Sequence, residues 1–414
     1  MQDNEKKPAL RFKGFTDPWE QRKLGDAFER VVRKNTNNES RLPLTISAQD
    51  GLVDQITYFN NRVASRDVSN YYLVYNGEFA YNKSTSDGYP FGAVKRLDWY
   101  EKGVLSTLYI VFALKHPEKD DSDFMTVFYD TDRWHRGVAE RAAEGARNHG
   151  LLNISADDFF DIDTTMPEDK VEQEKIGRLL KKLDTLITLH QRKYERLVNI
   201  KKSMLDKMFP QNGASVPEIR FKGFTDPWEQ RKLGEIAKEA VRNDPASDAP
   251  IMMITAGNGF IEQSDRYAFN NAGESLKKYI LLECGELAYN HGASKLRPYG
   301  SCFALTTVEK ARIPFVYHCF SVEKSNPEFL SIELNGANVE NQLRKIVSSG
   351  ARMDGLLNIA YSEYTEVTVQ LPKKEEQDWI AKFFKHLDTL ITLHQRKLEK
   401  LQNIKKSCLE KMFV

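Results

Sequence analysis

Two loops of the sequence collect side chains that bind phosphate groups and base edges. The stretch 81–91 reads YNKSTSDGYPF and the stretch 289–299 reads YNHGASKLRPY. Lysine and arginine pair with phosphates, whereas serine, asparagine and tyrosine form hydrogen bonds with bases and sugars. Ordinary surface loops share this composition, so a purely structural interpretation stays open. The candidate nucleic-acid contacts are Lys83, Ser84, Tyr89 and Arg96 near the first loop, Lys295, Arg297 and Tyr299 in the second, and Arg133, Arg136 and Arg141 on a predicted helix.

The motifs that would carry catalysis or hold a metal are missing, so we predict no catalytic residue and no metal ligand. The dipeptide Gly-Lys does not occur, which excludes a P-loop ATPase, and no G-x-S-x-G, H-E-x-x-H or zinc-deaminase pattern is present. The segment 326–329 (NPEF) resembles an amino-methyltransferase motif but has Glu where the second Pro belongs. The four cysteines have no C-x-x-C spacing and predict free thiols. These absences favour an adaptor or reader whose chemistry is supplied by partners.

The chain is an internal duplication. Residues 11–25 recur identically at 220–234, and 183–209 agree with 387–413 at 22 of 27 positions. The bodies between these ends share only scattered segments, such as G-E-x-A-Y-N at 77–82 and 285–290, and G-A-R followed by G-L-L-N-I in 145–154 and 350–359. Near-identical ends around divergent bodies suggest one mechanical task done twice and one recognition task done in two ways. Recent gene conversion at the ends is the alternative.

The repeated entry segment contains Asp17, Pro18 and Trp19, and again Asp-Pro-Trp at 226–228. Aspartate is a preferred helix N-cap and proline is favoured at the first helical position. We therefore predict a helix N-cap or an anchor here.

The repeated C-terminal segments predict a coiled coil. Seam residues recur at alternating spacings of 4 and 3 from Ile176 to Met208 and from Ile380 to Met412. Each helix of about 35 residues would measure roughly 50 Å and needs a partner along its narrow apolar seam. We expect the two helices to pair antiparallel about a pseudo-two-fold axis, with the bodies at opposite ends. The central seam residues are Leu183, Ile187, His190, Leu197, Leu387, Ile391, His394 and Leu401.

Polar residues interrupt this seam. Its two histidines, His190 and His394, are expected to fix the register rather than bind metal. Where Lys201 and Lys405 occupy seam positions, the seam is expected to shift toward the neighbouring isoleucines.

Composition bounds the class of protein. The 414 residues carry 60 Lys+Arg and 59 Asp+Glu, a net charge of +1 that argues against a polybasic binder. Segments 172–209 and 376–413 carry +5 and +3, so the rest is net acidic and neither body can hold DNA by bulk charge. No apolar stretch reaches about 18 residues, and residues 1–10 do not resemble a signal peptide, which predicts a cytoplasmic protein.

The predicted fold class is α+β. We expect strands at 71–74, 109–114, 279–282 and 315–322, and helices at 133–147 and 339–347. The expected organisation is a first mixed α/β body at 1–168, a long helix at 169–209, a linker at 210–218, a second body at 219–373 and a second long helix at 374–414.

The ordered, doubled pattern resembles the DNA-specificity subunit of type I restriction–modification systems over essentially the whole chain. The second copy has Leu-Pro at 371–372, Glu-Gln at 376–377, Ile380 and LDTLI at 387–391. The first copy has Met166 in place of the leucine, a conservative departure, and otherwise keeps the set.

The resemblance implies that each body is a target recognition domain that reads one half of a bipartite, asymmetric DNA sequence in the major groove. The helices would set the spacer and dock two methyltransferase subunits, which bind S-adenosylmethionine and methylate adenine N6. Two translocase–nuclease subunits using ATP and Mg²⁺ would complete an enzyme for defence against foreign DNA. This chain would hold no cofactor. Arg297→Ala should then weaken specific DNA binding without affecting docking. A standalone methyltransferase or nuclease, and a structural coiled-coil protein without a DNA role, remain alternatives.

Overall fold

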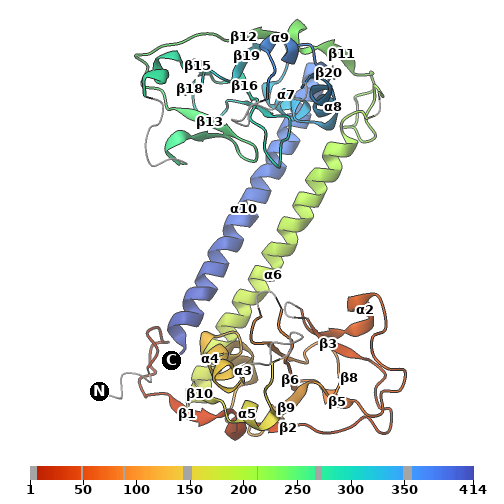
Figure 1. Cartoon of the computed structure of the whole chain (residues 1–414), viewed down its shortest axis with the longest axis vertical. Helices are drawn as coiled ribbons and strands as arrows, with labels where there is room; N and C mark the ends of the chain where they lie inside the picture. Colours follow the sequence, from red (N-terminus) through yellow and green to blue (C-terminus); the bar gives the residue numbers. More distant parts are fainter. Residues whose placement is uncertain are drawn as a thin grey trace. The chain divides into compact units, whose positions relative to one another are not determined.

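The chain folds into two units of matching construction (Figure 1). The computed structural model describes residues 7–47, 50–86, 89–142, 152–211, 213–265, 273–347 and 357–414. Unit 1 comprises Met1–Arg192 with Gln395–Val414, and unit 2 comprises Lys193–His394. Each unit therefore contains one body and a part of both long helices, α6 (Lys170–Lys207) and α10 (Lys374–Met412).

Both bodies have the same order of elements. In unit 1 these are β1 (Glu20–Lys23), α1 (Leu24–Ala27), β2 (Phe28–Arg30), β3 (Leu44–Ser47), β4 (Gly51–Asp54), α2 (Gln55–Phe59), β5 (Tyr72–Tyr75), β6 (Phe79–Asn82), β7 (Ala93–Arg96), β8 (Lys102–Leu105), β9 (Ile110–Leu114), α3 (Ser122–Phe128), α4 (Asp132–Arg141), α5 (Ala156–Phe160) and β10 (Asp163–Met166). In unit 2 they are β11 (Glu229–Lys232), β12 (Ala237–Glu239), β13 (Met252–Thr255), β14 (Gly259–Glu262), β15 (Ile280–Glu283), β16 (Leu287–Asn290), β17 (Ser301–Ala304), β18 (Lys310–Ile313), β19 (His318–Val322), α7 (Pro327–Leu334), α8 (Ala337–Ile346), α9 (Tyr361–Tyr364) and β20 (Thr368–Leu371), with 3₁₀ turns at Leu233–Glu235, Gln263–Asp265 and Gly273–Lys278.

The sheets repeat as well. A four-stranded antiparallel sheet has the order β2-β9-β6-β7 in unit 1 and β12-β19-β16-β17 in unit 2. The two-stranded sheets β1-β10, β3-β4 and β5-β8 correspond to β11-β20, β13-β14 and β15-β18. The prediction of duplicated mixed α/β bodies with long helices that pack together is confirmed. The predicted helix at 133–147 is α4 as far as Arg141, and residues 143–147, with most of both G-A-R/G-L-L-N-I segments, lie outside the described residues.

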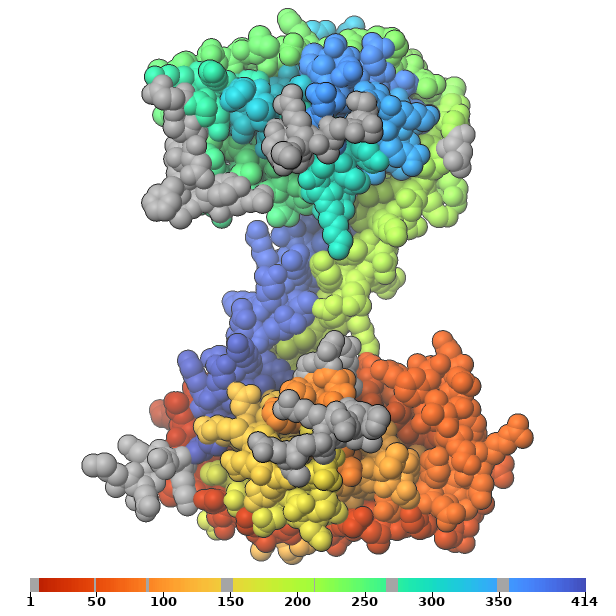
Figure 2. All heavy atoms as spheres, viewed as in Figure 1, coloured from red at the N-terminus to blue at the C-terminus, as the bar shows by residue number. Residues whose placement is uncertain are grey.

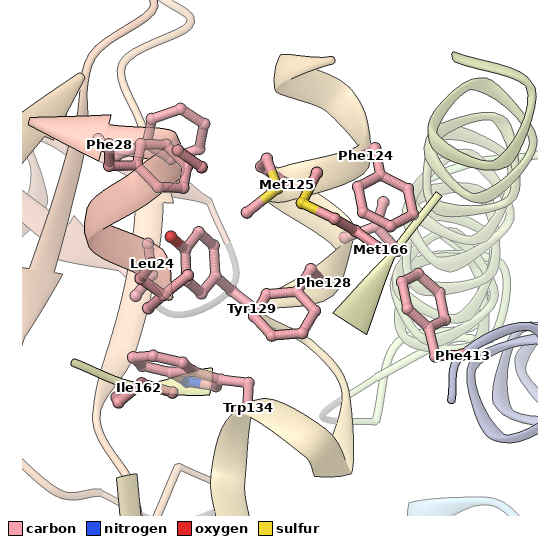
Figure 3. Close-up of a cluster of buried hydrophobic side chains, with 14 of the residues drawn as sticks. Leu24, Phe28, Phe124, Met125, Phe128, Tyr129, Trp134, Ile162, Met166 and Phe413 are labelled. Carbon is pink, nitrogen blue, oxygen red and sulfur yellow. The ribbon is translucent and has the colours of Figure 1, made fainter. Parts of the chain in front are cut away.

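The entry segment forms no helix cap, so of the two predicted roles the cap is wrong. The residue after Trp19 begins strand β1, which pairs with β10 from Glu20 to Lys23. Trp19 is instead an anchor: it is 1% exposed and its ring packs edge-on against Phe124 and Phe413. Figure 3 shows Phe124 and Phe413 among the buried side chains of the unit 1 core. Tertiary burial of the indole outweighs the local preference for a cap.

A buried ion pair ties each entry segment to its long helix. The Arg11 guanidinium donates to both carboxylate oxygens of Glu172, at 2.6 and 2.8 Å, and Glu172 is 1% exposed. In unit 2, Arg220 holds Glu376 in the same way at 2.7 and 2.6 Å. The next residue in each helix, Gln173 or Gln377, accepts a backbone N–H at the start of α3 or α7. The repeated Glu-Gln pair therefore fixes how each body sits on its helix.

The long helices run antiparallel within each unit. In unit 1, Lys405 Nζ lies 2.7 Å from Asp184 Oδ1, while Phe413, directly after the end of α10, stacks on Phe124 beside the first turns of α6. In unit 2, Lys201 Nζ lies 2.5 Å from Asp388 Oδ1, and Phe209 packs against the earlier Phe384. In both units, residues further along one helix therefore contact residues earlier in the other, as in an antiparallel pair.

The predicted central seam residues are covered in part, as are Tyr194, Ile200 and Leu398 at or beside the remaining seam positions. Leu183 and Leu387 are buried, and the others are half-buried: Ile187, His190, Leu197, Ile391, His394 and Leu401. At the second seam lysine the predicted shift does not occur, because Ile404 is 40% exposed while Lys405 points inward to Asp184 and Asp130. Paired carboxylates make the buried ammonium acceptable.

Candidate nucleic-acid interface

Each body carries a hairpin loop, and the two loops are closed by the same contacts at the point where they join their strands. The first loop (residues 83–92) joins β6 to β7, and the second loop (residues 291–300) joins β16 to β17. The hydroxyl of Tyr81 donates to the carbonyl of Phe91 at 2.9 Å, and that of Tyr289 donates to the carbonyl of Tyr299 at 2.6 Å. Burial raises the pKa of both phenols above their ordinary value. Each hydroxyl therefore stays protonated and closes the foot of its loop.

A glycine ends each loop because no side chain fits there. Gly92 and Gly300 have φ angles of 73° and 82°. A Cβ on Gly92 would collide with the carbonyl oxygen of Asn82, and one on Gly300 would lie 2.6 Å from that of Asn290. Positive φ and close backbone approach both select glycine.

The repeated G-E-x-A-Y-N segment stabilises the turn that leads into each hairpin. Glu78 accepts the backbone N–H of Tyr75 at 2.8 Å and binds Arg33 at 2.7 Å. Its counterpart Glu286 accepts the N–H of Glu283 at 2.8 Å and pairs with Arg242. The recurrence of this segment therefore reflects a structural role, in which the glutamate braces the turn and the tyrosine closes the loop.

A second chain segment lies alongside each loop. The N–H of Leu152 donates to the carbonyl of Lys83 at 3.0 Å, and the N–H of Leu357 donates to that of His291 at 2.9 Å. These leucines belong to the repeated G-L-L-N-I segments, so that repeat also positions the loops.

The two loops join their strands in the same way, but their tips differ. In the second loop, the N–H of Ser294 donates to the carbonyl of Arg297 at 3.0 Å, which leaves Lys295 and Leu296 on the corner. The side chain of Leu296 is 66% exposed. The segment projects from the surface of unit 2 (Figure 2). The first loop has the matching turn from Ser86 to Tyr89, with its two corner residues outside the described residues.

A neighbouring hairpin extends this surface in unit 2. The side-chain amide of Asn290 donates to the carbonyl of Ile254, at the end of β13, at 3.1 Å. A Cβ on Gly257 would lie 3.7 Å from a methyl carbon of Leu296, so the β13–β14 turn borders the second loop. Asn258 in that turn is exposed. Neither Leu296 nor Asn258 is among the contact residues predicted from the sequence; Ser294 and Pro298, which favour a turn on either side of Leu296, were the available clue.

The predicted contact residues fall into two groups. Ser84, Arg133, Arg136 and Lys295 are exposed, and the two arginines share helix α4. Others lie half-buried against the protein itself: Lys83 beside the Ile154 carbonyl, Arg96 paired with Asp98 and Asp123, Arg141 with Asp161, Arg297 on the carbonyl of Asn335, and Tyr89 and Tyr299 within their loops.

Arg297 illustrates the second group. Its guanidinium donates at 2.7 Å to the carbonyl of Asn335 at the C-terminal end of α7. A cation there also interacts favourably with the negative end of the helix dipole. Burial lowers its pKa from the ordinary value. Arg297 thus supports the loop, whereas Lys295 is free to face a ligand.

The segment 326–329, which resembled a methyltransferase motif, has a structural role. The side chain of Asn326 caps α7 by accepting the N–H of Phe329 at 2.9 Å, and Pro327 occupies the first turn. Among the described residues, no group of three or more His, Cys, Asp or Glu side chains is arranged to hold a metal ion. In the same part of the chain, no helix is both long enough and apolar enough to cross a membrane.

Comparison with known proteins gives a domain match in the second half and a shared fold over the whole chain. Residues 225–403 match the model described as the Type I restriction modification DNA specificity domain. The S subunit of a type I restriction–modification system from M. genitalium is similar over 99% of both chains, with a TM-score of 0.59 and 13% identity, which shows the fold. The HsdS subunit from Thermoanaerobacter tengcongensis is similar over 95% of this chain and 96% of its own (TM-score 0.40, 15% identity). A structure titled for complex assembly and conformational transition of the type I R-M system is similar over 95% and 97% (TM-score 0.41, 14% identity).

The matched domain covers most of the second half, and the first half repeats its entry segment, its strand order and its long helix. Residues 225–403 thus match the DNA specificity domain of type I restriction–modification systems, and the chain as a whole has the fold of an S subunit of such a system.

Proposed function

We propose that the chain reads a bipartite, asymmetric DNA target, one half with each body. In this proposal residues 1–168 and 219–373 are the recognition domains, 169–209 and 374–414 are the long helices, and 210–218 is the linker. The observation that carries the proposal is the pair of loops with the same base and different tips. Because the two loops join their strands in the same way, both tips are presented alike, and tips of different sequence can select different nucleotide bases.

The helices would hold the two half-sites at a constant separation, much as dimer geometry fixes half-site spacing in other readers. Their outward faces carry the excess of basic residues and would dock two methyltransferase subunits. S-adenosylmethionine would bind to those subunits, and ATP and Mg²⁺ to two restriction subunits. The assembled surface would complete the positive charge that the net acidic bodies lack.

The test is a genome-wide map of N6-methyladenine in cells with and without this chain. We expect methylation at one bipartite sequence only when the chain is present. A map that does not depend on the chain would contradict the proposal. Methyl transfer to DNA by the isolated chain with S-adenosylmethionine would instead favour a standalone methyltransferase.

Lys295→Ala is expected to weaken target binding about 3- to 10-fold and to reduce the salt dependence by about one counterion, because an exposed lysine at a loop tip is suited to a phosphate contact. The measurement is a DNA titration of the assembled complex at several salt concentrations. Lys232→Ala is the control, because Lys232 pairs with Glu366 in the entry region. Equal effects of the two changes would remove Lys295 from the interface.

A further inference from the structure

One charged cluster joins four elements of unit 1. Lys405 on α10 places its ammonium 2.7 Å from Asp184 Oδ1 on α6 and 3.1 Å from Asp130 Oδ2 in the turn between α3 and α4. Asp130 also lies 3.8 Å from the ammonium of Lys95 on β7, the strand that directly follows the first loop. The helix pair is therefore linked by charge, through a single turn, to the hairpin that presents the loop.

The cluster is partly shielded from water: the side chains of Asp130 and Asp184 are 31% and 42% exposed, and the ammonium between them is covered further. The side chain of Lys405 is 18% exposed. Burial lowers the pKa of Lys405, but the carboxylates of Asp130 and Asp184 outweigh it, so the net pKa is raised. The ammonium stays charged, and its removal would leave two carboxylates partly buried and facing each other.

Tyr89 of the first loop lies within the field of this cluster. Burial raises the pKa of Tyr89, Asp130 and Asp184 raise it further, and Lys405 opposes them. A change in the cluster therefore reaches the loop both through Lys95 and at Tyr89.

In the described part of unit 2 no ion pair makes this connection, although the helix segment that carries the lysine has the same sequence. Lys201 lies in the same N-I-K-K-S segment as Lys405 and pairs with Asp388 at 2.5 Å. The turn between α7 and α8, however, consists of the neutral residues Asn335 and Gly336. The amide oxygen of Asn335 accepts the N–H of Cys302 on β17 at 3.1 Å, and its carbonyl accepts Arg297. The turn holds the second loop through hydrogen bonds to the backbone carbonyl and the amide of Asn335, and this neutral side chain offers Lys201 no charge.

We propose that Lys405 is a positioning residue for DNA recognition by the first loop: it anchors Asp130 to the helix pair, and Asp130 in turn holds the hairpin through Lys95. Lys405 itself does not contact DNA. The inference rests on the proposed function and makes recognition of one half-site depend on the helix pair, while recognition of the other does not.

The test compares Lys405→Met with Lys201→Met in the subunit assembled with its methyltransferase partners. Binding is measured to duplexes carrying the mapped target and to duplexes with single-base changes in either half. For Lys405→Met we expect discrimination in the first half-site to fall roughly 5- to 10-fold, with the second half-site unchanged. For Lys201→Met we expect neither half-site to change by more than about 2-fold.

Two further variants separate positioning from simple destabilisation. Asp130→Asn gives unit 1 the residue type of unit 2, keeps the Lys405–Asp184 pair and should also relax the first half-site alone. Lys405→Arg retains the charge and should keep most of the discrimination. Equal effects of Lys405→Met and Lys201→Met, or unchanged first-half discrimination in Asp130→Asn, would overturn the inference. If the wild-type complex showed no bipartite target, the proposed function itself would fail.

Discussion

Insertion of seven residues into each long helix, after Arg192 and after His394, is expected to abolish recognition of the original target and to create a target with a longer spacer. Seven residues preserve the heptad seam and lengthen each helix by about 10 Å. Base pairs rise about 3.4 Å each, so the spacer should grow by about one to three base pairs, limited by the rotation of the groove along the duplex. Both half-site sequences should stay the same.

The readout for the inserted helices is the N6-methyladenine map of cells carrying the variant. The control is a seven-residue insertion in α6 alone, which displaces half of one seam relative to its partner and should prevent a stable helix pair. Methylation at the original spacer by the doubly extended variant would refute the role of the helices as a spacer.

Glu172→Ala is expected to lower the free energy of unfolding by about 3–5 kcal/mol. Glu172 is 1% exposed and accepts two hydrogen bonds from Arg11, so its removal leaves a poorly solvated guanidinium without a partner. The measurement is urea unfolding of the complete chain. Glu376→Ala should act similarly on unit 2, since Arg220 binds it in the same geometry.

The matched control replaces both partners, Arg11→Met with Glu172→Met, which should cost much less because no buried charge is left unpaired. A loss below about 1 kcal/mol for Glu172→Ala would mean that this pair does not hold the entry segment on its helix.

The architecture was readable because its signals are periodic or repeated. The 4–3 spacing from Ile176 to Met208 specifies a seam without any knowledge of the body, and the duplication supplies a second helix to pair with it. The shared topology of the bodies was foreshadowed only by fragments, such as G-E-x-A-Y-N. That fragment recurs because Glu78 and Tyr81 satisfy backbone groups that every such hairpin leaves open.

The candidate site was less accessible, because residue type does not reveal whether a charge is already paired. Arg96 and Lys295 look equivalent in a loop-rich sequence, yet Arg96 is held by Asp98 and Asp123 while Lys295 is exposed. The carboxylates come from a nearby turn and a separate helix, and no local pattern specifies that meeting. The helix-cap prediction for the Asp-Pro-Trp segment was wrong for the same reason: burial of Trp19 among residues distant in the sequence outweighed the local preference of the segment for a helix cap.

The sequence by itself therefore determined the duplication and the paired long helices, because these depend on periodicity and on order along the chain. Only the tertiary structure decided which charged side chains form ion pairs within the protein and which remain exposed. It placed Lys405 with Asp130 and Lys201 with Asp388, although both lysines lie in identical pentapeptides. Electrostatic partners are chosen by distance in space, and identical local sequences acquire different roles when the turn opposite them carries Asp130 in one body and Asn335 in the other.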